Sequence, residues 1–211
     1  MKSTVTTLDE LLHHNHARTA AFHQHPFFGL LQESTLADAR KLDVLMACIQ
    51  GFSNNFQNIL FIRQALCVDP RFKTAFSQHL SEEIGHDTLL AHQRGDASVV
   101  RDTLFDAILA WFSYQMLVLD NAERAALMHL VLETGADYFY RVAAPSLGKH
   151  VASSYFQFHA EADDGHANLV MDLLEGLGPK TYARLGDIVD AGWDMIDAML
   201  ERVRWLVEQA A

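Results

Sequence analysis

Hydrophobic residues recur every three or four positions along almost the whole chain. This spacing places them on one face of an α-helix, and no useful length shows the strict alternation that marks a strand. Proline and glycine divide the pattern into seven segments of helical periodicity. The segments cover approximately residues 8–25, 35–69, 69–92, 99–119, 121–142, 150–175 and 179–211. Because the connections are short, the pattern predicts one all-α bundle over residues 1–211.

The ends of these segments carry recognisable signals. Thr7, with Glu10 three residues later, is the expected N-cap of the first segment. Ser34 and Asn121 are the expected caps of two later segments. A kink is expected at Gly51, and the sequence AAPSLGK is expected to end a helix before residue 150.

One spacing of imidazoles and a carboxylate occurs twice. The triplets are H-x-x-x-E-x-x-H at His79, Glu83 and His86, and H-x-x-x-D-x-x-H at His159, Asp163 and His166. On a helix these positions fall within roughly 60° of one another, so each triplet predicts a polar stripe on one face. Gly85 and Gly165 precede the last histidine of each triplet. A glycine within a helix costs about 1 kcal/mol relative to alanine, so the matching places suggest a bulky metal cluster near the backbone.

Both stripes lie in segments that also carry many apolar residues, and so does Glu133 in HLVLETGADYF. Titratable groups inside a bundle are costly unless they are paired or bind a metal. Carboxylates and imidazoles suit iron or manganese, whereas structural zinc sites usually use thiolates. Six ligands suit two metal ions about 3.5–4 Å apart with bridging carboxylates. The expected ligands are Glu83, His86, Glu133, His159, Asp163 and His166.

Three further side chains are candidates for roles beside the expected ligands. Glu82 is an alternative to Glu83 as a ligand, and His79 is expected beside the metal site and outside the ligand set. Arg63, alone in the apolar run ILFIRQAL, is either a substrate carboxylate anchor or a residue at the surface or in a structural ion pair. The histidines near the N-terminus share no face with a carboxylate and are expected at the surface. They are His13, His14, His16, His23 and His25.

Composition limits the classes of partner. The chain has 16 Lys and Arg against 27 Asp and Glu, a net charge of −11, which argues against nucleic acid and anionic membranes as partners. No apolar run approaches the roughly 20 residues needed to span a bilayer, and the first residues do not resemble a signal peptide. Cys48 and Cys67 are expected as buried free thiols in a cytoplasmic protein. We expect a small-molecule substrate, and the sequence leaves open whether two copies pair in a homodimer.

The motifs resemble those of the haem-oxygenase-like di-iron oxidases and oxygenases, which share the seven-helix fold of haem oxygenase, thiaminase II and pyrroloquinoline quinone synthase. Glu83 and His86 match the family's first ligand pair, Glu133 its lone glutamate, and the triplet from His159 to His166 its last motif. The resemblance covers most of the chain by helix order. It implies two Fe(II) ions, O2 as co-substrate, and oxidative cleavage, N-oxygenation or desaturation. Amino-acid- or fatty-acid-like substrates in natural-product biosynthesis are implied as well.

Two alternatives remain open. A ferritin-like four-helix bundle uses a glutamate from each of two helices and E-x-x-H from two others. Such a bundle would need Glu33 as its fourth element, and it leaves His159 without a place. The second alternative keeps the haem-oxygenase-like fold as a metal-free, thiaminase-II-like hydrolase or small-molecule-binding protein. No cysteine stands in a recognised nucleophile motif for that activity.

Overall fold

The computed structural model describes residues 5–95, 98–150, 154–161 and 169–210, and every regular element in these ranges is a helix. The elements are α1 (Leu8–Phe22), η1 (Pro26–Leu31, a 3-10 helix), α2 (Glu33–Leu36), α3 (Ala39–Leu66), α4 (Pro70–Glu83), α5 (His86–Gln93), α6 (Thr103–Val118), α7 (Asn121–Ala125), η2 (Ala126–Glu133, a π-helix), α8 (Thr134–Leu147), α9 (Ser154–Glu161), α11 (Met171–Leu174) and α12 (Pro179–Gln209). The all-α prediction is confirmed.

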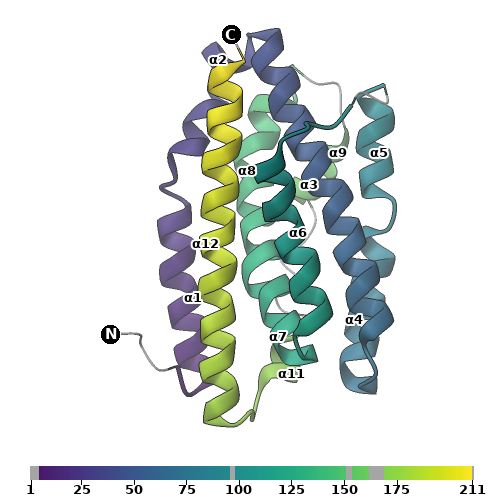
Figure 1. Ribbon diagram of the computed structural model, residues 1–211, viewed down its shortest axis with the longest axis vertical. Coiled ribbons are helices and arrows are strands. Elements are labelled where there is room, and N and C mark those ends of the chain that lie inside the picture. Colours follow the sequence, from purple (N-terminus) through teal and green to yellow (C-terminus); the bar gives the residue numbers. More distant parts are fainter. Residues whose placement is uncertain (1–4, 96–97, 151–153, 162–168, 211) are drawn as a thin grey trace.

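The long helices lie along the length of an elongated bundle (Figure 1). α12 spans its full height beside α1, while α4 and α5 follow one another along α3. α3 contacts α4, α5, α6 and α12, and α12 also contacts α1, α6 and η2, so these two long helices connect most of the other elements. Within the described residues no helix is long and apolar enough to cross a membrane.

The core runs continuously between these helices. Leu60 of α3, Phe76 of α4, Phe112 of α6 and Trp193 of α12 are all almost completely buried. α12 approaches η2 so closely that a Cβ on Gly192 would lie 2.6 Å from Leu127 Cδ1. Burial of these faces drives the assembly, since short isolated helices are marginally stable in water.

The predicted helix ends were right in part. Thr7 caps α1 by accepting from the Glu10 N–H. The cap near residue 121 is Asp120 instead of Asn121, in a capping box with Glu123. The cap expected at Ser34 was wrong, because residue 34 lies inside α2.

The positions at which helices break differ from the predicted positions. α3 remains helical through Gly51, where the missing side chain leaves room for Phe105 of α6. Pro145 lies inside α8, which ends two residues later, at Leu147. The segment expected from 35 to 69 begins with the separate short helix α2, and Asp38 then caps α3 by accepting from the Arg40 and Lys41 N–H groups.

Candidate metal centre

Three of the six predicted ligands come together: Glu83 at the end of α4, His86 at the start of α5 and His159 of α9. One ligand atom from each lies within 4.8 Å of the other two. Glu83 Oε2 is 2.8 Å from His86 Nδ1 and 3.9 Å from His159 Nε2. All three side chains are at most 16% exposed. Two imidazoles and a carboxylate in this arrangement fit one ion of iron or manganese.

The sequence predicted that the stripe from His79 to His86 lies on one continuous helix, and this prediction was wrong. α4 ends at Glu83, and Gly85 has a φ of 90° before α5 begins. A left-handed conformation of this kind favours glycine, since a Cβ would clash with the following carbonyl oxygen. Among the described residues no atom lies within 4 Å of a Cβ placed on Gly85, so the positive φ of the turn is what requires a glycine there. The sequence analysis placed Gly85 inside a helix, and its position in a turn between α4 and α5 is a correction.

Polar side chains on α3 hold this turn in place. Gln57 Oε1 accepts from the Gly85 N–H at 2.8 Å, and Gln50 Nε2 donates to the Asp87 carbonyl at 3.0 Å. Ser53 Oγ, between them on the same face, accepts from the Tyr155 hydroxyl at 3.2 Å. The sequence analysis missed this row. Its signal was polar residues at positions 50, 53, 54 and 57 of an otherwise apolar helix, which is the spacing of one helical face.

His159 is fixed by its own helix. Its Nδ1–H donates to the Tyr155 carbonyl at 2.9 Å, because a carbonyl oxygen can only accept. The tautomer therefore carries its lone pair on Nε2, the nitrogen that faces Glu83. Second-sphere hydrogen bonds of this type orient histidines that bind metals. Burial lowers the pKa of His159, although the charge of Glu83 acts against this, so the imidazole is neutral at neutral pH.

Two tyrosines enclose His159. The rings of Tyr140 and Tyr155 lie 4.4 and 4.3 Å from the imidazole, between ring centroids. Their hydroxyls are hydrogen bonded at 2.7 Å, and burial raises the pKa of Tyr155 to about 12. Both phenols therefore stay protonated beside the candidate metal centre, and their rings keep water away from it.

Glu133 contacts another histidine and is not one of the three groups that converge. It ends the π-helix η2, and its Oε1 is 2.7 Å from His79 Nε2. The negative charge of Glu133 is a minor influence on the pKa of His159, acting against the lowering caused by burial. π-helical segments are frequent at functional sites. Asp163 and His166, the other two predicted ligands, lie outside the described residues.

The remaining candidates occupy different surroundings. Glu82 is exposed and accepts from Gln78 Nε2, so Glu83 and not Glu82 faces His86. Arg63 is fully buried, and its Nη1 and Nη2 contact His129 and His79. These contacts give the guanidinium a place in the protein interior, and none of them supports a substrate anchor. Cys48 and Cys67 are buried free thiols, as predicted.

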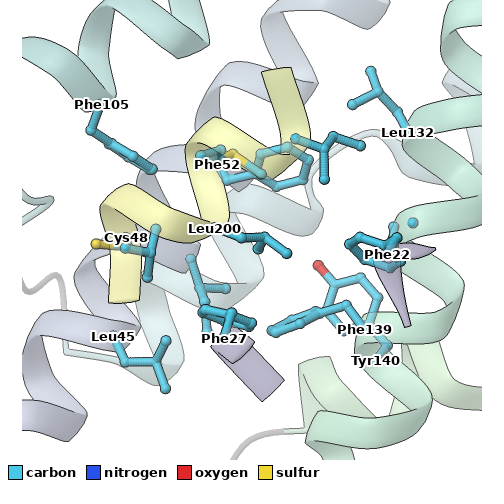
Figure 2. A pocket seen from close by; sticks show the side chains of 16 residues that line it. Phe22, Phe27, Leu45, Cys48, Phe52, Phe105, Leu132, Phe139, Tyr140 and Leu200 are labelled. Atoms are coloured by element: carbon cyan, nitrogen blue, oxygen red, sulfur yellow. The ribbon is translucent and has the colours of Figure 1, made fainter. Parts of the chain in front are cut away.

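An apolar cavity of about 80 Å³ lies next to the tyrosine pair. Its lining comes mainly from α3, α8 and α12 and includes Phe22, Phe27, Phe52, Phe139 and Leu200. Figure 2 shows the Tyr140 hydroxyl oxygen directed among these hydrocarbon side chains. Tyr140 thus contacts the cavity on one side and His159 on the other.

Known proteins resemble the chain in fold. No protein-family model matches it. It is 29% identical over 199 residues to the uncharacterised protein RP592 of Rickettsia prowazekii (strain Madrid E), across 94% of this chain and 95% of that protein. A crystal structure of a domain of unknown function with a haem oxygenase-like fold, from Shewanella denitrificans OS217, matches with a TM-score of 0.70. That match has 14% identity and covers 97% of this chain and 96% of the other.

The chain has a haem-oxygenase-like fold. The fold predicted from the motifs and helix order is therefore confirmed, in preference to the ferritin-like bundle. At 14% identity the likeness concerns the arrangement of helices alone. The chemistry must be argued from the residues of this chain.

Proposed function

We propose that this protein is an O2-dependent non-haem iron oxidase or oxygenase. The observation that carries the proposal is the convergence of Glu83, His86 and His159, from three separate helices, on one point. A second iron would take its ligands from Glu133, Asp163 and His166, which the sequence motif supplies. Ferrous ions held by these side chains supply the electrons that O2 activation requires.

The protein's own groups prepare the centre for this chemistry. The Tyr155 carbonyl fixes the His159 tautomer, and Gln57 holds the turn that carries His86. Manganese is an alternative metal, because the same oxygen and nitrogen ligands suit it.

The apolar cavity supports a substrate with a hydrocarbon part. Engineered cavities of about 150 Å³ hold a benzene molecule. A cavity of about 80 Å³ therefore fits a shorter alkyl group. This favours an amino-acid-like substrate over a long fatty acid, with its alkyl part beyond Tyr140 and its reacting carbon near His159. A role in natural-product biosynthesis fits such a substrate.

A metal-free hydrolase of the same fold is the second candidate, and its supporting observation is the same cavity, which needs no metal to hold a ligand. A thiaminase-II-like mechanism needs a reactive thiolate. Burial raises the pKa of Cys48, which lines the cavity, to about 12, so its thiolate is scarce at neutral pH. The structure therefore favours a bound small molecule over nucleophilic catalysis for this alternative.

Anaerobic loading with Fe(II) tests the proposal. We expect iron to remain bound after gel filtration, and O2 uptake to accelerate when a short-chain amino acid of the right shape is present. His159→Ala should lose both properties. His92→Ala, which removes an exposed histidine on α5, is the matched control and should keep them. A wild-type protein that binds no iron would exclude the oxidase and favour the metal-free alternative.

A further inference from the structure

A line of buried polar groups joins α3, α4 and η2 behind the candidate metal centre. Arg63 Nη2 lies 2.9 Å from His79 Nδ1, and His79 Nε2 lies 2.7 Å from Glu133 Oε1. Arg63 and His79 have no exposed surface, and the Glu133 side chain is 11% exposed. The line therefore begins in the protein interior and ends on the mostly buried carboxylate of Glu133.

The protons along this line have only one consistent arrangement. A guanidinium can only donate, so His79 Nδ1 accepts from Arg63 and the imidazole proton sits on Nε2. That nitrogen lies 2.7 Å from Glu133 Oε1, in direct contact with the carboxylate. Burial lowers the pKa of Arg63 to about 9, so the guanidinium is still charged at neutral pH. Arg63 also stacks on Phe76, at 4.1 Å from the ring centroid, which fixes the plane of its donors.

A buried charge is in general weak evidence for a role in stability. Replacing buried ionic groups with well-packed apolar side chains is often neutral or stabilising. The line also ends on a carboxylate whose charge reaches His159. Within the π-helix that carries Glu133, the His129 carbonyl accepts a hydrogen bond from the Thr134 hydroxyl at 3.1 Å.

We propose that Arg63 and His79 are positioning residues that hold one oxygen of Glu133, so that its other oxygen is presented to a metal ion at the centre. This inference rests on the proposed metal-dependent function. His79 itself does not bind the metal, because the nitrogen facing Glu133 carries a proton and the other faces Arg63. The contacts of His79 with Arg63 and Glu133 thus explain why the stripe on α4 begins with a histidine that is not needed as a ligand.

Two substitutions at one position separate positioning from simple packing. His79→Gln keeps a carbonyl acceptor for Arg63 and an N–H donor for Glu133, whereas His79→Leu removes both. Outer-sphere partners of metal ligands typically contribute about 10- to 100-fold to metal affinity. We expect His79→Leu to weaken Fe(II) and Co(II) binding by about that factor, and His79→Gln to bind within about threefold of wild type. Binding is measured anaerobically by equilibrium titration, with the Co(II) absorption bands reporting the coordination.

His129→Leu is the matched control. It removes an equally buried imidazole that contacts the same arginine and lies 4.8 Å from the His79 ring, while the contacts of His79 with Arg63 and Glu133 remain. We expect it to lower the melting temperature without changing metal affinity. Wild-type affinity in His79→Leu would overturn the inference, and so would equal losses in His79→Gln and His79→Leu, which would make His79 a ligand.

Nitrogen NMR of the metal-free protein, labelled with 15N-histidine, gives a readout that needs no metal. We expect the proton of His79 on Nε2 and none on Nδ1. The opposite tautomer would overturn the inference whatever the metal affinity. A wild-type protein that has the expected tautomer but binds neither Fe(II) nor Co(II) would instead show that the proposed metal-dependent function is wrong. The positioning role of Arg63 and His79 would then have no metal ligand to act on. The two failures are therefore distinguishable.

Discussion

At the scale of single residues, the candidate centre depends on buried polar groups that are each fixed by a partner. His159 is oriented by the Tyr155 carbonyl and Glu133 by His79. Such groups are costly to bury alone, and their partners determine which nitrogen or oxygen points to the centre. The chemistry of the site is therefore set as much by the second layer of residues as by the ligands themselves.

His159→Ala should remove iron binding without unfolding the protein. The imidazole supplies one of three converging donor atoms, so its loss leaves Glu83 and His86 as an incomplete site. A neutral buried imidazole contributes little charge to the fold, so circular dichroism should show an unchanged helical content. Iron content after anaerobic loading is the measurement. A His159→Ala protein with the full wild-type iron content would show that the histidine is not a ligand.

At the scale of helices, the turn between α4 and α5 decides where His86 lies. Periodicity predicted one helix here, because apolar residues continue at helical spacing on both sides of the turn. The break depends on a hydrogen bond from the Gly85 N–H to Gln57, which is 28 residues away in sequence. A contact of that kind has no local signal, and neither does the extra residue per turn in η2. The sequence could thus identify Glu83 and His86 as candidate ligands but could not predict the turn that brings their side chains together.

Gly85→Ala should weaken metal binding more than it weakens the fold. A non-glycine residue with positive φ costs about 1–2 kcal/mol, and here any relief would rotate His86 away from Glu83. Gly95→Ala is the control, because Gly95 also has a positive φ and open space at its Cβ but lies beyond the far end of α5. Urea unfolding should show similar losses for both variants. Equal Fe(II) affinity in both would show that the turn does not position His86.

A second helix end ties two helices together through charge. Asp102 caps α6 and also accepts from Arg202 of α12 at 2.6 and 2.9 Å. The hydrogen bond from Arg202 lowers the pKa of Asp102 to about 2. Since the pKa of an unfolded aspartate is about 3.9, the stabilisation is complete above that value and disappears as the pH falls towards 2.

Asp102→Asn should therefore lower the free energy of unfolding by about 1–2 kcal/mol at pH 7 and by less at pH 3. Urea unfolding at both pH values measures the difference. Asp106→Asn, an exposed change in the first turn of the same helix, is the control and should have a smaller effect at pH 7. A pH-independent loss in Asp102→Asn would show that the effect does not come from the ion pair with Arg202.

At the scale of the whole molecule, the hydrophobic pattern was sufficient to predict the class of fold, and the resemblance of the motifs and helix order predicted its kind. Phe76, Phe112 and Trp193 were all in segments of helical periodicity, and all are core residues. The meeting of His159 with Glu83 is different in nature, because it joins residues 76 positions apart on helices whose relative placement no local pattern specifies. Only the repeated motif, read together with its resemblance, could indicate it.

Metal binding should stabilise the whole bundle, because the ligands come from separate helices. Ferrous iron that binds the folded state alone stabilises it by about 2.7 kcal/mol at 100 times its dissociation constant. For a domain of roughly 150–250 residues each kcal/mol raises the melting temperature by about 2–4 °C, so the expected rise is about 5–10 °C. Differential scanning calorimetry under anaerobic conditions, with and without excess Fe(II), measures the rise in melting temperature.

Mg(II) is the control ion, since it prefers all-oxygen ligands and should produce a smaller shift. In His159→Ala the rise should disappear, because α9 then no longer contributes a ligand. A wild-type melting temperature that excess Fe(II) leaves unchanged, together with no bound iron at equilibrium, would exclude an iron centre that links α4, α5 and α9.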